Sequence, residues 1–322
     1  MECFKKITMD STTNILLLGG FGFIGTNILK YIDVNYADKY ACIVFDKFTA
    51  HPHGLQFDCV RHVYAGDFSD SMLIERVFQE NKIDMVFHAI STTVPVNSLN
   101  AKYDVLSNLL PTLDVLNNMV KYKVPSIVYL SSGGAIYGTQ SEKIHNEDSD
   151  VYPISSYGVV KLAIEKYIIQ YAQLYNIHPL ILRLSNPYGR YHYSMKQGVI
   201  NIAIKKALHE ETLPIWGDGC GRKDYIYIED VMDIMFKLLT KKDIHGVINI
   251  GSGQTHALND IVKIIQSNIS TLKVQHTEAH KFDVSNFELD INKLINIIGN
   301  YPFTTLENGI RQTINWTKTL CD

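Results

Sequence analysis

At 322 residues the chain exceeds a typical single domain, so its length predicts two lobes or one large α/β domain. Hydrophobic residues make up 46% of it and charged residues 20%, which is typical of a globular protein with a sizeable core. The net charge of −3, with lysines and arginines scattered along the chain, gives no electrostatic reason to expect nucleic acid or an acidic membrane as a partner.

The cysteines and histidines argue against a disulfide framework and a metal centre. The five cysteines form an odd, widely spaced set without a CxxC pair, as expected in a reducing compartment. The histidine pairs at 51/53 and 276/280 lack cysteines or carboxylates at metal-ligand spacing. Residues 1–13 hold no signal core, and no apolar run approaches the roughly 20 residues that span a bilayer. We therefore expect a cytoplasmic protein without a metal.

Short apolar runs alternate with amphipathic stretches through the first half of the chain. Six runs predict strands: Asn14–Gly19, Ala41–Asp46, Arg61–Ala65, Asp84–His88, Ser126–Ser131 and Pro179–Leu184. Apolar residues at three- and four-residue spacing predict helices: Ile24–Ile32, Met72–Phe78, Tyr103–Val120 and Ile154–Tyr175. This alternation, with strands that are apolar throughout, predicts a doubly wound parallel sheet with helices on both faces.

After about Leu184 the rhythm changes. A turn-rich segment (Asn186–Gly198) is followed by a predicted helix (Val199–His209) and a glycine-rich loop (Trp216–Gly221). A predicted strand (Val247–Ile250) and a second predicted helix (Leu258–Ile269) come after them. The sequence thus predicts a Rossmann-type α/β domain over residues 1–184, with returns from about 223–250. A smaller C-terminal α/β substrate lobe is predicted over residues 185–322.

The first predicted strand runs directly into a glycine-rich turn that precedes a helix. The sequence Gly19-Gly20-Phe21-Gly22-Phe23-Ile24-Gly25 spaces three glycines as GxxGxxG rather than as the commoner GxGxxG. Both spacings allow a tight turn, a close approach of backbone to pyrophosphate, and a phosphate at the helix N-terminus. A glycine-rich turn alone also fits a turn without a ligand, so the residues around it have to distinguish the two interpretations.

Acidic residues after the next two strands supply that context. Asp46 ends the second strand, at the distance where a carboxylate accepts hydrogen bonds from the adenosine ribose hydroxyls. A carboxylate there repels a 2′-phosphate, and no arginine follows it immediately, so NAD is favoured over NADP. Asp67, after the third strand, either reaches the adenine edge or caps a helix over residues 69–78.

A tyrosine and a lysine lie four residues apart in the predicted helix Ile154–Tyr175. Tyr157 and Lys161 share one helix face, so a phenol and an ammonium group can converge on one pocket. A phenol titrates at about pH 10 in water, but a neighbouring ammonium group and a positive nicotinamide ring both favour the phenolate. Tyr157 is therefore the candidate proton acceptor. Among 19 tyrosines, the spacing alone also fits surface packing.

Together these motifs resemble the extended short-chain dehydrogenases/reductases, in particular their sugar-nucleotide epimerase/dehydratase branch. The resemblance covers nearly the whole chain, through motifs in the family's order: GGFGFIG at 19–25, Ala65-Gly66-Asp67, His88-Ala89, Asn108, SSGGAIYG at 131–138, YGVVK at 157–161, Asn186-Pro187-Tyr188-Gly189, and Gly217-Asp218-Gly219 to Asp224-Tyr225-Ile226. It implies a Rossmann domain for NAD, a C-terminal substrate lobe, and a homodimer built on the helices 103–120 and 154–175.

Carried over position by position, the resemblance implies a catalytic Tyr157 and a Lys161 that also holds the nicotinamide ribose. The NAD-binding residues that it implies are Gly19, Gly22, Phe23, Ile24, Gly25, Asp46, Asp67, Phe68, Ala89, Asn108, Ser131, Tyr157 and Lys161. The hydroxyl that assists the tyrosine falls at Gly133 when counted back from Tyr137. Ser132, the nearest hydroxyl, is assigned this catalytic role, and Ser131 is the alternative.

The loop after the fifth strand discriminates between reactions of the family. Dehydratases resemble Thr-Asp-Glu there, with carboxyl groups that eliminate water, and decarboxylating relatives keep a glutamate. This chain has Gly133-Gly134-Ala135 instead. The resemblance therefore favours epimerisation over elimination, although the glycines also fit close packing against the cofactor.

Six positions are expected to bind the substrate: Thr92, Ser132, Tyr157, Asn186, Lys223 and His280. Asn186 matches the asparagine that binds the sugar-nucleotide diphosphate, whereas Lys223 and His280 stand where the family has arginines. A lysine neutralises phosphate as a point charge but lacks the bidentate fork of arginine. The run Ser91-Thr92-Thr93 lies where the family places residues between nicotinamide and sugar, and an ordinary polar loop is the alternative.

The leading hypothesis from the sequence is epimerisation at C4 of a nucleotide-activated sugar, with a UDP-sugar first, through a transient 4-keto sugar. Such an activity would serve polysaccharide synthesis. The alternatives are a nucleotide-sugar reductase or dehydrogenase, a dehydratase, and a catalytically silent nucleotide-binding regulator. The intact Tyr157 and Lys161 argue against the regulator.

Overall fold

Seven parallel strands form the main sheet of the protein. A computed structural model describes residues 12–93, 100–138, 144–241, 243–278 and 286–320. The strand order is β11-β7-β5-β4-β1-β2-β3, so the chain adds strands first on one side of β1 and then, from β4 onward, on the other. This is the doubly wound arrangement, and it confirms the predicted fold class. The strands are β1 (Thr13–Leu18), β2 (Tyr40–Asp46), β3 (Val60–Ala65), β4 (Met85–His88), β5 (Ser126–Ser132), β7 (His178–Leu184) and β11 (Gly246–Ile250).

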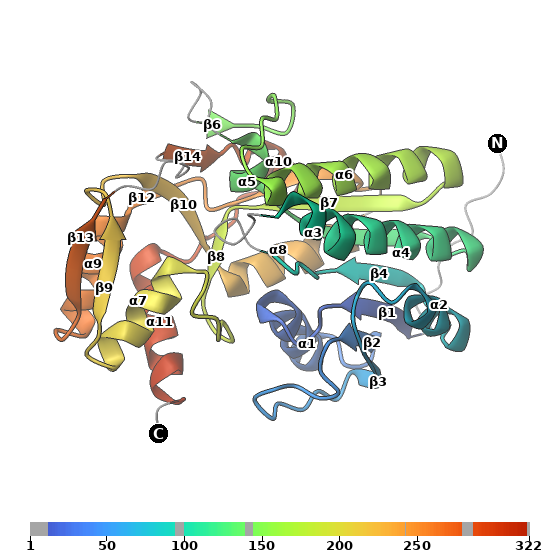
Figure 1. Ribbon diagram of the computed structural model, residues 1–322, viewed down its shortest axis with the longest axis horizontal. Helices are drawn as coiled ribbons and strands as arrows, with labels where there is room; N and C mark the ends of the chain where they lie inside the picture. The colour runs from blue at the N-terminus through green and yellow to red at the C-terminus, as the bar shows by residue number, and fades with distance from the viewer. Residues whose placement is uncertain (1–11, 94–99, 139–143, 242, 279–285, 321–322) are drawn as a thin grey trace.

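Helices cover both faces of this sheet (Figure 1). On β1, Ile15 and Leu17 pack into the hydrophobic cluster of one face, and Leu16 and Leu18 into that of the other. Burial on both faces explains why the strand is apolar throughout. The first face carries α1 (Phe23–Asn35) and α8 (Ile228–Thr240), and the second carries α2 (Ser71–Glu80), α4 (Leu110–Lys121) and α6 (Ser156–Tyr175).

The helix predicted over residues 103–120 is not continuous. It consists of α3 (Ala101–Asp104), a π-helical turn (Val105–Leu109) and α4. Pro111 stands in the first turn of α4 and has no N–H to donate to the carbonyl of Ser107, so the α-helical ladder is interrupted there. The π-helical turn contains Asn108, one of the predicted cofactor residues.

The C-terminal part of the chain, together with the short strand β6 (Ile144–His145), builds two smaller sheets beside the main one. One has the strand order β12-β10-β14-β6, with β8 paired to β10, and the other pairs β13 with β9. Within residues 223–250, β10 belongs to the smaller sheet, whereas α8 and β11 belong to the main layers. The strands of these smaller sheets are β6 (Ile144–His145), β8 (Asn186–Tyr188), β9 (Thr212–Trp216), β10 (Arg222–Tyr227), β12 (Thr255–Ala257), β13 (Lys273–Thr277) and β14 (Asn286–Leu289). The helices not yet named are α5 (Gly133–Tyr137), α7 (Val199–Leu208), α9 (Leu258–Asn268), α10 (Asn292–Ile298) and α11 (Leu306–Lys318).

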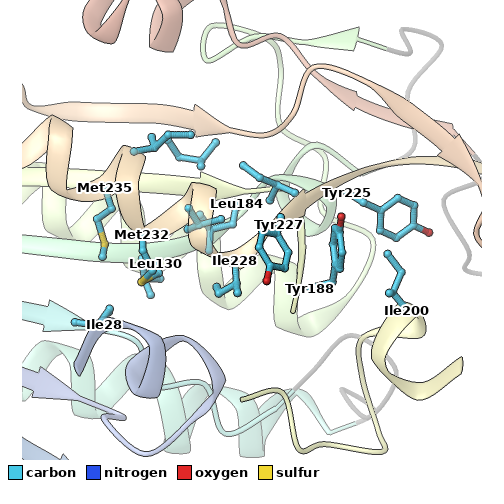
Figure 2. Close-up of a cluster of buried hydrophobic side chains, with 14 of the residues drawn as sticks. Ile28, Leu130, Leu184, Tyr188, Ile200, Tyr225, Tyr227, Ile228, Met232 and Met235 are labelled. Atoms are coloured by element: carbon cyan, nitrogen blue, oxygen red, sulfur yellow. The ribbon is translucent and has the colours of Figure 1, made fainter. Parts of the chain in front are cut away.

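One hydrophobic cluster joins the main sheet to the C-terminal lobe (Figure 2). It runs from Ile28 of α1 and Met232 of α8, through Leu184 at the end of β7, to Tyr188 and Ile200 beyond it. The ends of the parallel strands are thereby held against the second lobe, where an α/β sheet binds its ligands. Within the described part of the chain, no helix is long and apolar enough to cross a membrane.

Candidate active site

The glycine turn forms a narrow cradle at the start of α1. Gly19 has a φ of +82°, which favours glycine, and a Cβ on Gly25 would collide with the carbonyl oxygen of Gly19. The helix begins after Gly22, and no side chain of the described residues caps it, so the first N–H groups of α1 are available to another acceptor. A phosphate group meets that requirement, and the cradle therefore fits the pyrophosphate of a dinucleotide at Phe23, Ile24 and Gly25.

Asp46 ends β2 next to this cradle. One of its carboxylate oxygens accepts a hydrogen bond of 2.9 Å from the N–H of Phe21, and the other accepts one of 3.4 Å from the N–H of Phe48. Burial raises the pKa of the Asp46 carboxyl, and these backbone contacts oppose that rise. The contact between Asp46 and the ribose hydroxyls stays a prediction.

Asp67 and Phe68 follow β3 along the same edge of the sheet. Asp67 accepts hydrogen bonds from the N–H of Ser69 at 2.8 Å and from its hydroxyl at 2.6 Å, and these contacts lower the pKa of Asp67. The alternative that Asp67 caps a helix over residues 69–78 is wrong, because α2 begins at Ser71 and its cap is Asp70. The contact of Asp67 with adenine stays a prediction. Phe68 is buried against His88.

Tyr157 and Lys161 lie in the first turns of α6. The hydroxyl of Ser155 accepts the N–H of Gly158 and so fixes where the helix starts. The Tyr157 hydroxyl lies within hydrogen-bonding reach of the hydroxyls of Ser132 and Ser91. Burial raises the pKa of Tyr157 to about 12, and the two serine contacts act in the opposite direction. Positive charge near the phenol is therefore needed before Tyr157 can serve as a base at neutral pH.

Lys161 supplies such a charge one helical turn further on. Its Nζ donates a hydrogen bond of 2.9 Å to the carbonyl oxygen of Leu130 in β5 and lies 5.8 Å from the centroid of the Tyr157 ring. Burial lowers the pKa of Lys161 to about 8, while the Glu165 carboxylate raises it. The ammonium group is therefore charged at neutral pH and close to losing its proton.

The two serines that end β5 point in different directions. The structure places the Ser132 hydroxyl at Tyr157, in keeping with the assignment made from the sequence. Ser131 is buried, and its hydroxyl donates a hydrogen bond of 2.6 Å to Glu165. The alternative that Ser131 assists Tyr157 does not match this geometry, and the contact of Ser131 with the cofactor stays a prediction.

Asn108 fastens the loop that follows β4. Its side-chain oxygen accepts the N–H of Thr92 at 2.9 Å, and its side-chain nitrogen donates to the Thr92 hydroxyl at 2.6 Å. The residue before this loop, Ala89, donates its N–H to Leu18 across the two central strands. Ser91 belongs to the same polar run, and no catalytic role was predicted for it from the sequence. The structure holds it beside Tyr157.

A buried ion pair near Tyr157 and Lys161 was not predicted from the sequence. Arg183 of β7 and Glu165 of α6 are almost fully buried and meet at 2.7 Å. Two signals in the sequence point to them. Glu165 follows Lys161 by four residues in an apolar stretch, and Arg183 interrupts an apolar strand.

The predicted diphosphate residues lie on β8 and β10 in the C-terminal lobe. The side chain of Asn186 donates to the carbonyl oxygen of Asp224 at 2.8 Å, which ties the two strands together. Lys223 stands opposite His256 on β12, and Asp224 is fully buried, with a pKa that burial raises to about 6. His280 lies outside the described residues.

Comparison with known proteins assigns the family. Residues 15–251 match the model of the NAD dependent epimerase/dehydratase family. The chain belongs to this family. The match confirms the resemblance inferred from the motifs and, because the family is NAD-dependent, the expected cofactor NAD.

Several members of the family are similar to this chain over nearly their whole length. A "Putative UDP-glucose 4-epimerase" of Methanocaldococcus jannaschii is 33% identical over 94% of this chain and 98% of that protein. The solved UDP-glucose 4-epimerase of Thermotoga maritima with UDP-glucose is 28% identical, with a TM-score of 0.87 over 96% of this chain and all of that one. The Thermus thermophilus UDP-glucose 4-epimerase in complex with NAD is 26% identical, with a TM-score of 0.84 over 95% and 99%.

Relatives with other reactions are similar as well. The dTDP-4-dehydro-6-deoxyglucose reductase of Escherichia coli is 28% identical over 95% of this chain and 98% of that protein. The dTDP-glucose 4,6-dehydratase of Haemophilus influenzae is 28% identical over 94% and 97%. The chain is therefore an enzyme of the nucleotide-sugar epimerase/dehydratase type, and its reaction has to be argued from its own site.

Proposed function

We propose that the protein interconverts the C4 epimers of a nucleotide-activated sugar, with a UDP-sugar as the first candidate. The observation that carries the proposal is the loop after Ser132, which holds Gly133, Gly134 and Ala135 and no carboxylate. A Cβ at Gly133 would lie 2.9 Å from the side chain of Leu289 and 3.1 Å from that of Phe287, so β14 fills the space that a larger side chain would need. Elimination of water lacks its acid and base at this loop, whereas epimerisation needs only one proton acceptor.

In this mechanism Tyr157 takes the proton of the 4-hydroxyl while Ser132 and Ser91 hydrogen-bond the phenol oxygen. Lys161 stabilises the phenolate by its charge. Bound NAD supplies hydride acceptance from C4 and hydride return to it. Asn186 and Lys223 would anchor the diphosphate, a use of binding energy away from the reacting carbon that leaves the 4-keto sugar free to turn.

The test uses sugar nucleotides labelled at C4. The purified protein is incubated, without added cofactor, with UDP-, GDP- and dTDP-sugars that carry deuterium at C4, and the products are identified by NMR. We expect interconversion of 4-epimers in both directions, with deuterium kept at C4 and no net change in reduced-cofactor absorbance. Since the hydride returns to the carbon that it left, one NAD serves many turnovers.

A reductase is the second candidate, supported by the similarity to the Escherichia coli reductase. A reductase consumes one reduced cofactor for each keto sugar. Turnover that requires stoichiometric NADH, or label that accumulates in free reduced cofactor, would overturn the epimerase proposal and support the reductase.

We further propose that two copies of the chain pair through α3, α4 and α6. Tyr103, Leu106 and Leu110 form an exposed apolar stripe at three- and four-residue spacing on the first two helices and the turn between them. Val159 and Tyr167 extend this exposed apolar surface onto α6, which packs beside them. A second copy related by a two-fold axis would cover the same stripes on both chains.

Sedimentation analysis tests the dimer. We expect the wild-type protein to sediment as a dimer and Leu106→Glu to shift it to a monomer, because a charge at the centre of an apolar interface lacks a partner. Met72→Glu, at an equally apolar and more exposed position on α2, is the matched control and is expected to leave the dimer intact. A monomeric wild type would contradict the proposal.

A further inference from the structure

The Glu165 carboxylate is held rigidly by two elements of the main sheet. One oxygen accepts the Ser131 hydroxyl at 2.6 Å and the Nε of Arg183 at 3.1 Å, and the other accepts Arg183 Nη2 at 2.7 Å. Residues 131 and 183 are direct neighbours on the parallel strands β5 and β7. Both side chains therefore face α6, and Glu165 ties the helix to the end of both strands.

The arginine is fixed from its other side. Arg183 Nη1 donates to the hydroxyl of Tyr137 at 2.9 Å, and Tyr137 donates in turn to the side chain of Asn249 in β11 at 2.9 Å. The side-chain nitrogen of Asn249 donates hydrogen bonds to the carbonyl oxygens of His145 and Asp290, which connects the network to the smaller sheet. Because each member of this network is engaged, the Glu165 carboxylate has no freedom to turn away from its place under the site.

The position of Glu165 matters for the catalytic pair for two reasons. Ser131 immediately precedes Ser132, so its anchor fixes the strand end that presents the Ser132 hydroxyl to Tyr157. Glu165 also follows Lys161 by one helical turn and presents a negative charge to the buried ammonium group.

Few other charges face Lys161 among the described residues. From α6 the Tyr157 ring lies against it, and from β5 the ring of Tyr129 lies 4.8 Å from its Nζ. From β4, His88 is buried, and burial together with the Lys161 charge lowers the pKa of His88 to about 3, so this imidazole is neutral at pH 7. The carboxylate of Glu165 is thus the anion that acts on the Lys161 ammonium group among these neighbours.

We propose that Glu165 is a positioning residue for the Tyr157–Lys161 pair, which it serves by holding the end of β5 beside Tyr157 and by keeping Lys161 in its charged form. The proposal rests on the proposed function only in that Tyr157 is taken as the proton acceptor. The charge state of Lys161 can be measured without any sugar nucleotide, so the two can fail separately.

The test is the titration of Lys161 in the NAD-loaded enzyme. Lysine labelled with 13C at Cε is followed by NMR against pH, and the Lys161 signal is assigned by its absence in Lys161→Ala. Glu165→Gln keeps an oxygen for Ser131 and Arg183 but removes the negative charge, so the ammonium group loses its proton more readily. We expect the titration midpoint of Lys161 to fall by about one pH unit, a tenfold change in its acid dissociation constant.

The same variant should move the alkaline limb of the rate profile to lower pH, and Glu165→Asp should restore part of the wild-type midpoint. Glu147→Gln is the matched control, since Glu147 accepts a hydrogen bond at the far end of the same network and does not act on Lys161. A Glu165→Gln variant with lower thermal stability but an unchanged Lys161 midpoint would overturn the proposal and leave Glu165 a purely structural residue.

If Glu165→Gln fails to fold because Arg183 is left buried and unpaired, the double variant Glu165→Gln/Arg183→Met removes both charges. Replacement of a whole buried ion pair is commonly tolerated, whereas removal of one partner is not. The double variant should still shift the Lys161 midpoint downward, by less than Glu165→Gln because the Arg183 charge is removed together with the carboxylate, and a midpoint equal to that of the wild type would overturn the proposal.

Discussion

Tyr157→Phe should lower turnover by about a hundredfold or more while folding and NAD content stay near those of the wild type. A lost general base typically removes a factor of about 10² to 10⁴ in rate. The ring remains in place against Lys161, so the packing of α6 on the sheet is conserved. Only the hydroxyl that meets Ser132 and Ser91 is removed. Steady-state rates, NAD content by chromatography and thermal melting measure the three parts of this expectation.

Tyr129→Phe is the matched control for this variant. It deletes the same phenol hydroxyl from a buried tyrosine whose ring also faces Lys161, but one whose hydroxyl makes no hydrogen bond to either serine. The Tyr129 hydroxyl has no hydrogen-bond partner among the described residues, so its loss should leave turnover within a few-fold of the wild type. Tyr157→Phe with the rate of the wild type, or Tyr129→Phe with a hundredfold loss, would remove Tyr157 from the role of base.

The main sheet could be predicted closely from the sequence because its strands are buried on both faces. The apolar run from Ile15 to Leu18 in β1 is too short for a helix and is bounded by a glycine turn, so it indicates a buried strand, and β7 differs from its predicted start by one residue. The C-terminal strands give a weaker signal. β13 is exposed along its whole length and β6 has two residues, so neither carries a hydrophobic pattern that local sequence could show.

The residues of the candidate site likewise fall into those that local sequence could predict and those that it could not. Tyr157 and Lys161 could be identified because they lie on one helix at a spacing that brings them together by local geometry alone. Glu165 and Arg183 meet because α6 packs on β7, a contact between a helix and a strand that no short stretch of sequence contains. The π-helical turn that carries Asn108 depends on one proline within an otherwise regular pattern.

Loss of the Lys161 charge should be as damaging as loss of the phenol. Lys161→Met removes the cation that favours the phenolate, and we expect turnover to fall by about a hundredfold or more at the pH values where the wild-type lysine is charged. In the wild type the pKa of Lys161 is lowered to about 8 by burial. The active form has this group protonated, so the contribution of its charge to turnover is complete below that pKa and is lost as the pH rises through it. The positive ring of bound NAD moves this alkaline limb further toward neutral pH.

Lys161→Arg separates charge from shape. A guanidinium group stays protonated throughout the range, so this variant should lose the alkaline limb of the wild type. Its planar fork does not reproduce the single contact of Nζ with the Leu130 carbonyl, so its plateau should lie below that of the wild type and above that of Lys161→Met. Rates measured from about pH 6 to 10 at saturating substrate test both statements. An alkaline limb unchanged in Lys161→Arg would show that another group loses the proton, and Lys161 would then not set the pH range of the enzyme.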